Sequence, residues 1–433
     1  MPRRYKVLAI AEAANPEWVS VPLVGWSLAR ALADVADVHL VTQIRNRDAI
    51  LRAGVEEGRD FTAIDSEKVA ALAHRAAGFL RMGEGRGWTM VTALDGLAYP
   101  YFEHLVWRRF GAEIQAGDWD VVHRITPLSP TATSPIGPKV AKAGVPFVVG
   151  PLNGGVPWPP GFGRERRAER EWLSYLRQAY KLHPGRGRTL RAASAILTGS
   201  GHTRGEMPAG VQEKCIHLPE NAVDPARFDR VATQDAEGPL KGIFVGRLVP
   251  YKGPDMAIEA AAPLLASGRM TLDIVGDGPM RAELESLTVR LDVAESVRFH
   301  GNLPHAEVAS VLASAHVLVF PSIREFGGGV VLEAMATGVL PLVVNYAGPG
   351  ELVDDSTGVT VPVGPRADII EGFSARLEDL CADRGRVRAL AAAARAHALE
   401  RFTWDAKARQ ILSVYDWVTG AREDRPDPLG ESA

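Results

Sequence analysis

Short apolar runs alternate with helical or polar segments along the whole chain of 433 residues. Such runs are typical of parallel strands buried on both faces, and helical segments between them are typical of a doubly wound α/β fold. The runs fall into two sets, 7–11, 38–41, 120–122, 147–149 and 195–197, and then 242–245, 272–275, 297–299, 317–320 and 342–344. The pattern predicts two Rossmann-like halves.

A polar stretch with turn-forming residues and little periodicity, 221–239, separates the two sets. We therefore predict an N-terminal Rossmann-like domain over 1–225 and a second one over 238–405, facing one another across a substrate cleft. A helix is predicted over 406–422, where it could pack back on the N-terminal domain. The polar residues 423–433 contain Pro and Gly, and they are predicted to form a disordered tail.

Composition and charge narrow the class of protein. Hydrophobic residues make up 46% and charged residues 23%, which is typical of soluble globular proteins. The formal net charge of −3 argues against a basic nucleic-acid binder. The two cysteines, Cys215 and Cys381, are far apart, so neither a disulfide framework nor a zinc site is expected and a cytoplasmic location is favoured. No apolar run approaches the roughly 20 residues that span a bilayer.

One segment, 161–192, has a distinct charge, because it holds nine Lys or Arg residues and only three Glu. Trp172, Leu173, Leu176 and Tyr180 stand at helical spacing within it, which predicts a basic amphipathic helix. One interpretation is a solvated face over an ordinary core stripe. The other is contact with an anionic acceptor or with anionic lipid, which would place the protein peripherally at the inner face of the membrane.

The segment 321–338 carries the clearest chemistry. Glu325 and Glu333 stand eight positions apart with Gly327, Gly328 and Gly329 between them. The apolar run before them predicts a buried strand, and residues 330–336 predict a helix. A strand, a glycine loop and a helix N-terminus expose backbone N–H groups to an anion. The segment therefore predicts a ligand that carries phosphate and hydroxyl groups.

A second loop, 246–253, follows the first strand of the second half. Pro254 favours a helix start, which places Lys252 at the helix N-terminus. Arg247 and Lys252 could neutralise a diphosphate, or they could be surface charges in local ion pairs. In the next loop Gly276 permits a tight turn and close approach to a ligand, although Arg281 leaves the dinucleotide fingerprint incomplete.

In this order, the motifs within 240–365 resemble the retaining glycosyltransferases of the GT-B class, known as family 4 or group 1. The resemblance implies a GT-B fold whose C-terminal half holds a nucleotide-sugar donor, with UDP or GDP as the nucleotide. It implies roles for residues of this sequence: Arg247, Lys252 and the N–H groups of 327–329 for the diphosphate, Glu333, Gly276 and Leu303 for the nucleoside, and Glu325 as the catalytic residue at the transferred sugar.

Metal independence is also predicted, because no Asp-x-Asp stands where a metal-dependent transferase would carry one. The N-terminal half matches the family less closely. His123 ends a predicted strand, but Ile125 replaces the family's second histidine, so His123 is either catalytic or structural. Asn15, Asn153 and Gly154 follow predicted strands and are candidates for the acceptor side.

The predicted function is transfer of a sugar from a nucleotide-diphosphate donor to an acceptor with retention of anomeric configuration. The acceptor is left open among glycans, lipid-linked sugars and small molecules, and no nucleic acid is expected as a partner. One alternative is a nucleotide-sugar epimerase or hydrolase on the same fold. Another is a non-catalytic protein that binds sugar nucleotides.

Overall fold

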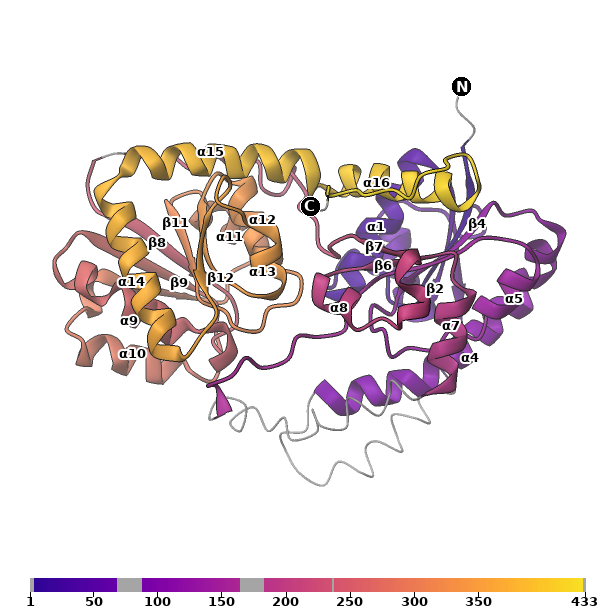
Figure 1. Ribbon diagram of the computed structural model, residues 1–433, viewed down its shortest axis with the longest axis horizontal. Coiled ribbons are helices and arrows are strands. Elements are labelled where there is room, and N and C mark those ends of the chain that lie inside the picture. The colour runs from indigo at the N-terminus through magenta and orange to yellow at the C-terminus, as the bar shows by residue number, and fades with distance from the viewer. Residues whose placement is uncertain (1–3, 68–87, 164–182, 236, 431–433) are drawn as a thin grey trace. The chain divides into compact units, whose positions relative to one another are not determined.

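The computed structural model describes residues 4–67, 88–163, 183–235 and 237–430, and they form two compact units (Figure 1). Unit 1 comprises 1–154, 172–220 and 404–433, and unit 2 comprises 155–171 and 221–403. The chain passes into unit 2 after Gly154, returns to unit 1, and enters unit 2 again after Glu220. A boundary near 221–239 was predicted, whereas the excursion over 155–171 was not.

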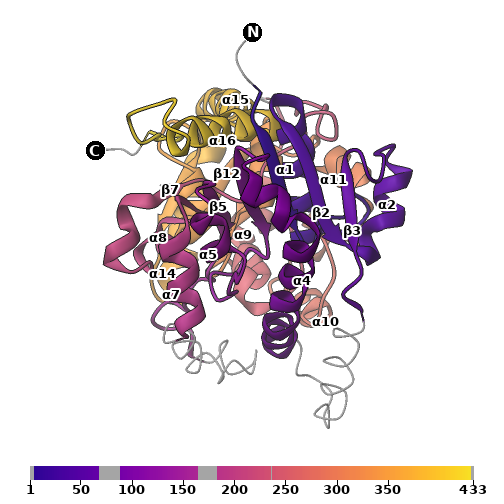
Figure 2. The same cartoon turned by 90° about the vertical axis from the view of Figure 1, so that its right-hand side faces the viewer.

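Unit 1 is built on a seven-stranded parallel sheet of order β3-β2-β1-β4-β5-β6-β7. Figure 2 shows β3 and α2 towards one side of this sheet and β7 towards the other. The strands are β1 (Lys6–Ala11), β2 (Asp37–Gln43), β3 (Phe61–Ile64), β4 (Val121–Thr126), β5 (Phe147–Leu152), β6 (Ala195–Thr198) and β7 (Cys215–His217).

Helices cover both faces of this sheet, because successive strand residues point to opposite faces. Val7 and Ala9 of β1 join a core with α1 and α16, whereas Leu8 and Ile10 join a second core with α4 and α5. The helices are α1 (Val21–Val35), α2 (Arg47–Arg52), α4 (Trp88–Ala116), α5 (Gly137–Lys142), α7 (Pro184–Ala192), α8 (Gly201–Gly205) and α16 (Trp404–Val418). The C-terminal helix therefore packs in unit 1.

Unit 2 is a six-stranded parallel sheet of order β10-β9-β8-β11-β12-β13. Its strands are β8 (Leu240–Val245), β9 (Met270–Val275), β10 (Val297–Gly301), β11 (Val317–Phe320), β12 (Leu340–Asn345) and β13 (Val359–Pro362). Its helices are α9 (Pro254–Ala266), α10 (Arg281–Arg290), α11 (His305–Leu312), α12 (Gly329–Ala336), α13 (Ala347–Leu352), α14 (Arg366–Ala382) and α15 (Arg384–Arg401). The strand order reverses between β8 and β11, which is where ligands bind in open α/β sheets.

The predicted fold class of two Rossmann-like doubly wound halves is confirmed, since every predicted strand is present. Three edge or near-edge strands, β3, β7 and β13, were not predicted. Their short sequences, FTAI, CIH and VTVP, interrupt the apolar residues with Thr, His or Pro, so none gives an apolar run that stands out from its surroundings.

Residues 423–430 belong to the predicted disordered tail, and the structure describes them in contact with unit 1. The Arg425 guanidinium donates to the carbonyl oxygen of Cys215 at 3.4 Å, and Pro426 is buried. Cys215 begins β7, so these residues are anchored on the sheet of unit 1. The polar composition of this segment gave no indication of that anchorage.

Candidate functional site

The site in unit 2 forms where β8 and β11 end. Lys252 closes the short 3₁₀ helix Pro250–Lys252 after β8, and Glu325 lies in the loop after β11. The two strands are hydrogen-bonded neighbours, so their following loops meet, and Lys252 Nζ lies 2.6 Å from Glu325 Oε2. The structure thus brings together the predicted diphosphate cation and the predicted sugar-facing carboxylate.

Both charged side chains are largely withdrawn from water, with 17% of Lys252 and 19% of Glu325 exposed. The Lys252 ammonium also lies 5.4 Å from the ring centroid of Phe320. A charge pair that is mostly buried is screened much less by salt than a surface pair. Lys252 is therefore held in place beside Glu325.

Glu333 lies on the first turns of α12, as predicted. Burial raises the pKa of its carboxyl to about 7, and the positive charge of Lys252 opposes this shift. Lys252 therefore acts electrostatically on both carboxylates of the segment. Gly328 precedes α12 in the left-handed conformation at φ 56°, and Gly329 is the first helical residue, so unpaired N–H groups begin there. Carboxylates, a cation and backbone donors thus share one end of the sheet.

The loops after β8, β9 and β10 lie against each other at this same end. The N–H of Gly276 donates to Gly301 O at 2.8 Å. Gly276 has φ 127°, and a Cβ there would lie 2.0 Å from Gly246 O, so only glycine fits. Leu303 follows two residues after Gly301 and is half-buried, whereas Arg247 is exposed on the loop after β8. Their roles towards a nucleoside and a diphosphate stay predictions.

His123 lies on β4 and is fully buried. Its Nδ1 lies 2.7 Å from the Tyr415 hydroxyl of α16, and its Nε2 lies 2.8 Å from Gly150 O. Burial lowers the pKa of this imidazole to about 4, opposed by the hydrogen bond with Gly150 O. The neutral ring accepts from Tyr415 and donates to Gly150, which gives it a structural role between β4, β5 and α16. We assign it no step in a reaction.

The three acceptor-side candidates lie at carboxyl ends of strands in unit 1. Asn15 is buried, and its side-chain oxygen accepts from the N–H of Glu17 at 2.9 Å. The amide of Asn153 donates to Glu220 Oε1 at 2.6 Å, and the N–H of Gly154 donates to Thr203 Oγ1 at 3.0 Å. These bonds order the loops after β1 and β5, and contact with an acceptor stays a prediction.

A buried lysine beside the segment after β7 was not predicted. Lys407 of α16 is 1% exposed, and its Nζ donates to Pro219 O. Burial lowers its pKa to about 7, opposed by the negative charge of Glu220. Nothing in an amphipathic helix containing one lysine indicates that this lysine faces the core.

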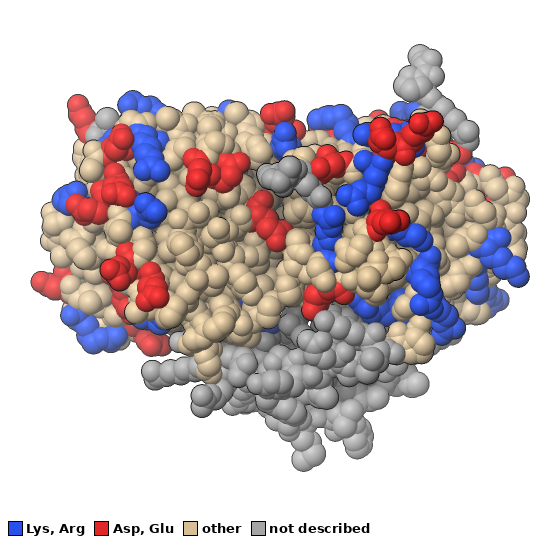
Figure 3. Space-filling view, viewed as in Figure 1, with Lys and Arg blue, Asp and Glu red and all other residues tan. Residues whose placement is uncertain are grey.

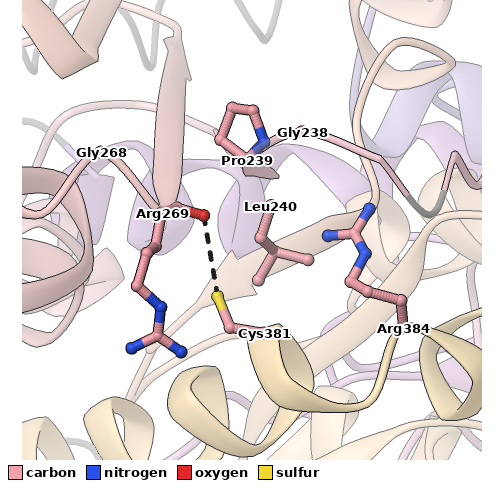
Figure 4. A pocket seen from close by; sticks show the side chains of 7 residues that line it. All are labelled: Gly238, Pro239, Leu240, Gly268, Arg269, Cys381 and Arg384. Atoms are coloured by element: carbon pink, nitrogen blue, oxygen red, sulfur yellow. Dashed lines mark hydrogen bonds between the residues drawn. The ribbon is translucent and has the colours of Figure 1, made fainter.

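A cavity of about 400 Å³ opens at the other end of the unit 2 sheet, where β8 and β9 begin (Figure 4). It is lined by Gly238, Pro239, Leu240, Gly268, Arg269, Cys381 and Arg384. Cys381 Sγ lies 3.9 Å from Arg269 O across it (Figure 4). This cavity is separate from the Lys252 site, because the two lie at opposite ends of the same strands.

Other expectations concern metal and membrane. Among the described residues, no group of three or more His, Cys, Asp or Glu is placed to hold a metal ion. Within the same part of the chain, no helix has the length and apolar character needed to cross a membrane.

Most of the predicted basic helix, 164–182, lies outside the described residues. Arg188 and Arg191 of α7 are described and exposed, and Lys and Arg side chains gather near α7 on the face in Figure 3.

Comparison with known proteins finds a family match for the C-terminal part of the chain. Residues 226–397 match the family "Glycosyl transferases group 1". The chain is 34% identical over 185 residues to 2-deoxystreptamine glucosyltransferase of Streptomyces kanamyceticus, which covers 40% of this chain and 47% of that protein. It is 31% identical over 253 residues to glycogen synthase of Mycobacterium tuberculosis, covering 56% of this chain and 59% of that protein. The chain thus spans about half the length of these curated relatives.

Solved structures match over nearly the whole chain. Anabaena HepE in complex with UDP gives a TM-score of 0.61 at 15% identity, covering 94% of this chain and 99% of HepE. Sucrose-phosphate synthase from Thermosynechococcus elongatus gives 0.60 at 16% identity, covering 97% and 100%. The fold is therefore the GT-B fold of glycosyltransferases. Within it, residues 226–397 are the part that matches the group 1 glycosyltransferase family.

Proposed function

We propose that the protein is a glycosyltransferase that moves a sugar from a nucleotide-diphosphate sugar to an acceptor with retention of anomeric configuration. The observation that carries this proposal is the Lys252–Glu325 ion pair beside Glu333, where β8 and β11 end. The match of residues 226–397 to group 1 glycosyltransferases supports it. So does the glycosyltransferase activity in the names of the relatives.

The chemistry follows from the residues. Breaking the bond between the anomeric carbon and the phosphate oxygen loads negative charge onto the diphosphate. Lys252, Arg247 and the N–H groups at the start of α12 stabilise that charge, with no metal ion in the proposal. Glu325 faces the sugar and stabilises positive charge or holds its hydroxyls. The acceptor oxygen attacks from the face that the phosphate leaves, and its proton passes to a phosphate oxygen.

Glu333 accepts hydrogen bonds from the ribose hydroxyls in this proposal, and the loops containing Gly276 and Leu303 contact the rest of the nucleoside. UDP and GDP are the nucleotides to test first, because HepE was solved with UDP and one relative is named as GDP-mannose-dependent. The acceptor binds near Asn15, Asn153 and Gly154 of unit 1. Glycans, lipid-linked sugars and small molecules are the acceptor classes. We place the protein in the cytoplasm, with peripheral contact with anionic membrane through the basic segment.

Turnover tests the proposal. We expect release of nucleoside diphosphate from UDP- or GDP-sugars only when an acceptor is present, and the glycoside formed should keep the anomeric configuration of the donor by NMR. An inverted product would contradict the mechanism. Rapid turnover of the donor without acceptor would indicate an epimerase or hydrolase, and tight donor binding without turnover across acceptor classes would indicate a binding protein.

A further inference from the structure

Residues 155–163, which we call the strap, belong to unit 2. In sequence they follow β5 of unit 1 after only two residues. Three of the nine residues are proline, at positions 157, 159 and 160. Proline fixes φ, so an extended segment of this composition loses little entropy when it docks. The strap is thus suited to hold a neighbour in a fixed position.

The neighbour is the loop that carries Glu325. Arg324, the residue before it, is buried with 6% exposure, and its Nε donates to Val156 O of the strap at 3.0 Å. The guanidinium lies 5.3 Å from the ring centroid of Trp158 and 5.8 Å from that of Phe326. An arginine held by a backbone acceptor and two aromatic rings has few orientations open to it.

Further contacts tie the strap to both sides of this loop. The Tyr346 hydroxyl at the end of β12 donates to Pro157 O at 3.0 Å. Trp158 packs edge-to-face on Tyr251, with ring centroids 6.4 Å apart, and Tyr251 precedes Lys252. Tyr251 O in turn accepts from the N–H of Ile323 at 3.0 Å. Both partners of the Lys252–Glu325 pair are therefore adjacent in sequence to residues that contact Trp158.

The far end of the strap is anchored as well. Phe162 is buried with 2% exposure, and Gly161 lies beside Pro365, which precedes α14, so that a Cβ at position 161 would be in ordinary contact with Pro365 Cα at 3.5 Å. The strap thus contacts unit 2 at the β11 loop, at the end of β12 and at the start of α14. A segment that contacts one unit at three places is held in a fixed position on that unit.

We propose that the strap positions Glu325 for the sugar of the donor, with Arg324 as the positioning residue and Trp158 as the surface that holds it. This inference rests on the proposed function, because it needs a donor sugar at Glu325. Gly155, the first residue of the strap, follows Gly154 directly in sequence, so the strap continues the loop after β5 that carries Asn153 and Gly154. Arg324 itself does not touch the reacting atoms.

The experiment compares binding of a nucleotide with binding of the same nucleotide carrying a sugar. Calorimetric titration of the full chain with UDP, UDP-glucose, GDP and GDP-mannose first shows which pair the wild type binds. In Arg324→Gln we expect the Kd for the nucleotide sugar to rise about tenfold, the size expected when one hydrogen bond to a charged group is lost. The Kd for the nucleotide alone should change less than about twofold, because Lys252, Arg247 and Glu333 are retained.

Graded variants separate positioning from simple support of the fold. Trp158→Leu should resemble Arg324→Gln, whereas Trp158→Phe, which keeps an aromatic face, should restore most of the nucleotide-sugar affinity. Tyr346→Phe removes only the hydroxyl that contacts Pro157 and should give a smaller change in the same direction. Arg290→Gln, an exposed arginine at the end of α10, is the matched control and should bind like the wild type.

Three results would overturn the inference. Unchanged binding of the nucleotide sugar in Arg324→Gln would show that the strap does not position Glu325. An equal loss for the nucleotide and the nucleotide sugar would show that the strap only supports the fold of unit 2. If the wild type binds none of the four ligands, the proposed function is contradicted. The inference about the strap is then contradicted too, because it requires a donor sugar at Glu325.

Discussion

Glu333 illustrates how a residue that is suited to binding can lower the stability of the fold. Its side chain lies on α12 where burial raises its pKa to about 7, against an ordinary value of 4.5. Folded protein therefore holds a proton on this carboxyl that the unfolded chain releases between pH 4.5 and 7, and this group's contribution to stability falls as pH rises through that window. Such a cost is expected where a carboxylate is retained for a ligand.

The first prediction concerns the pH dependence of nucleotide binding. Ionised Glu333 accepts charge-assisted hydrogen bonds from ribose, so affinity should decline as pH falls below about 7. We expect a loss of about fivefold to tenfold between pH 8 and pH 5.5, since a hydrogen bond to a charged group is stronger by about 1 kcal/mol. Glu333→Gln should bind weakly at both pH values and lose this slope. A wild type with flat affinity, measured by calorimetry, would contradict the role of Glu333.

The second prediction concerns Lys252. Replacing it with Ala removes the cation beside the diphosphate and leaves Glu325 without its 2.6 Å partner. Nucleotide affinity should fall about 10- to 100-fold, the size expected for a lost charge-assisted contact. Lys252→Arg keeps the charge and should recover part of the affinity. Equal binding by wild type and Lys252→Ala would show that this pair is only structural.

At the scale of elements, the third prediction concerns the glycine turn after β9. A Cβ at Gly276 would lie 2.0 Å from Gly246 O, and its φ of 127° is strained for any other residue. Gly276→Ala should therefore destabilise the protein by about 3 kcal/mol or more and displace the loop after β8. The control is Gly268→Ala, which has φ 69° but no atom within 4 Å of the added Cβ and should cost only about 1 kcal/mol. Similar melting temperatures for the two variants would contradict the account.

The fourth prediction concerns α16, which carries the buried Lys407. Its folded pKa of about 7 lies below the ordinary 10.5, so between these values the unfolded chain binds a proton that the folded chain has lost. This group therefore makes stability rise with pH across that window. Lys407→Met should flatten the rise between pH 7 and pH 10, measured by thermal unfolding. An unchanged slope would show that Lys407 is not buried as described.

The elements also show what sequence can and cannot predict. Central strands such as β8 and β11 stand out as apolar runs. Once these strands are located, the loops after them are located too, and Lys252 and Glu325 can be recognised in those loops as candidate site residues. The edge strands β3, β7 and β13 mix apolar residues with Thr, His or Pro and give no such pattern. The Arg324–Val156 bond joins residues 168 positions apart, and no local pattern indicates it. The burial of the Lys407 side chain likewise depends on tertiary packing, because the pattern of the helix alone would allow this side chain to face solvent.

At the scale of the whole molecule, each unit contains a piece of chain from beyond its main segment. Residues 155–171 belong to unit 2 although unit 1 residues precede and follow them, and α16 belongs to unit 1 although it follows unit 2 in sequence. Each unit is a complete parallel sheet covered by helices, yet neither is continuous in sequence. We therefore expect that residues 221–403 expressed alone would lack the strap and bind nucleotide sugars more weakly than the full chain. Calorimetry on both proteins, with circular dichroism to confirm folding, checks this, and equal affinity would contradict it.

The central claim is that the end of the unit 2 sheet, where Lys252, Glu325 and Glu333 lie, binds a nucleotide sugar. The most direct measurement is calorimetric titration of UDP- and GDP-sugars into the full wild-type chain and into Lys252→Ala. We predict saturable binding of at least one of these donors by the wild type and a clear loss in the variant. Absence of binding to every donor, or equal binding by both proteins, would contradict it.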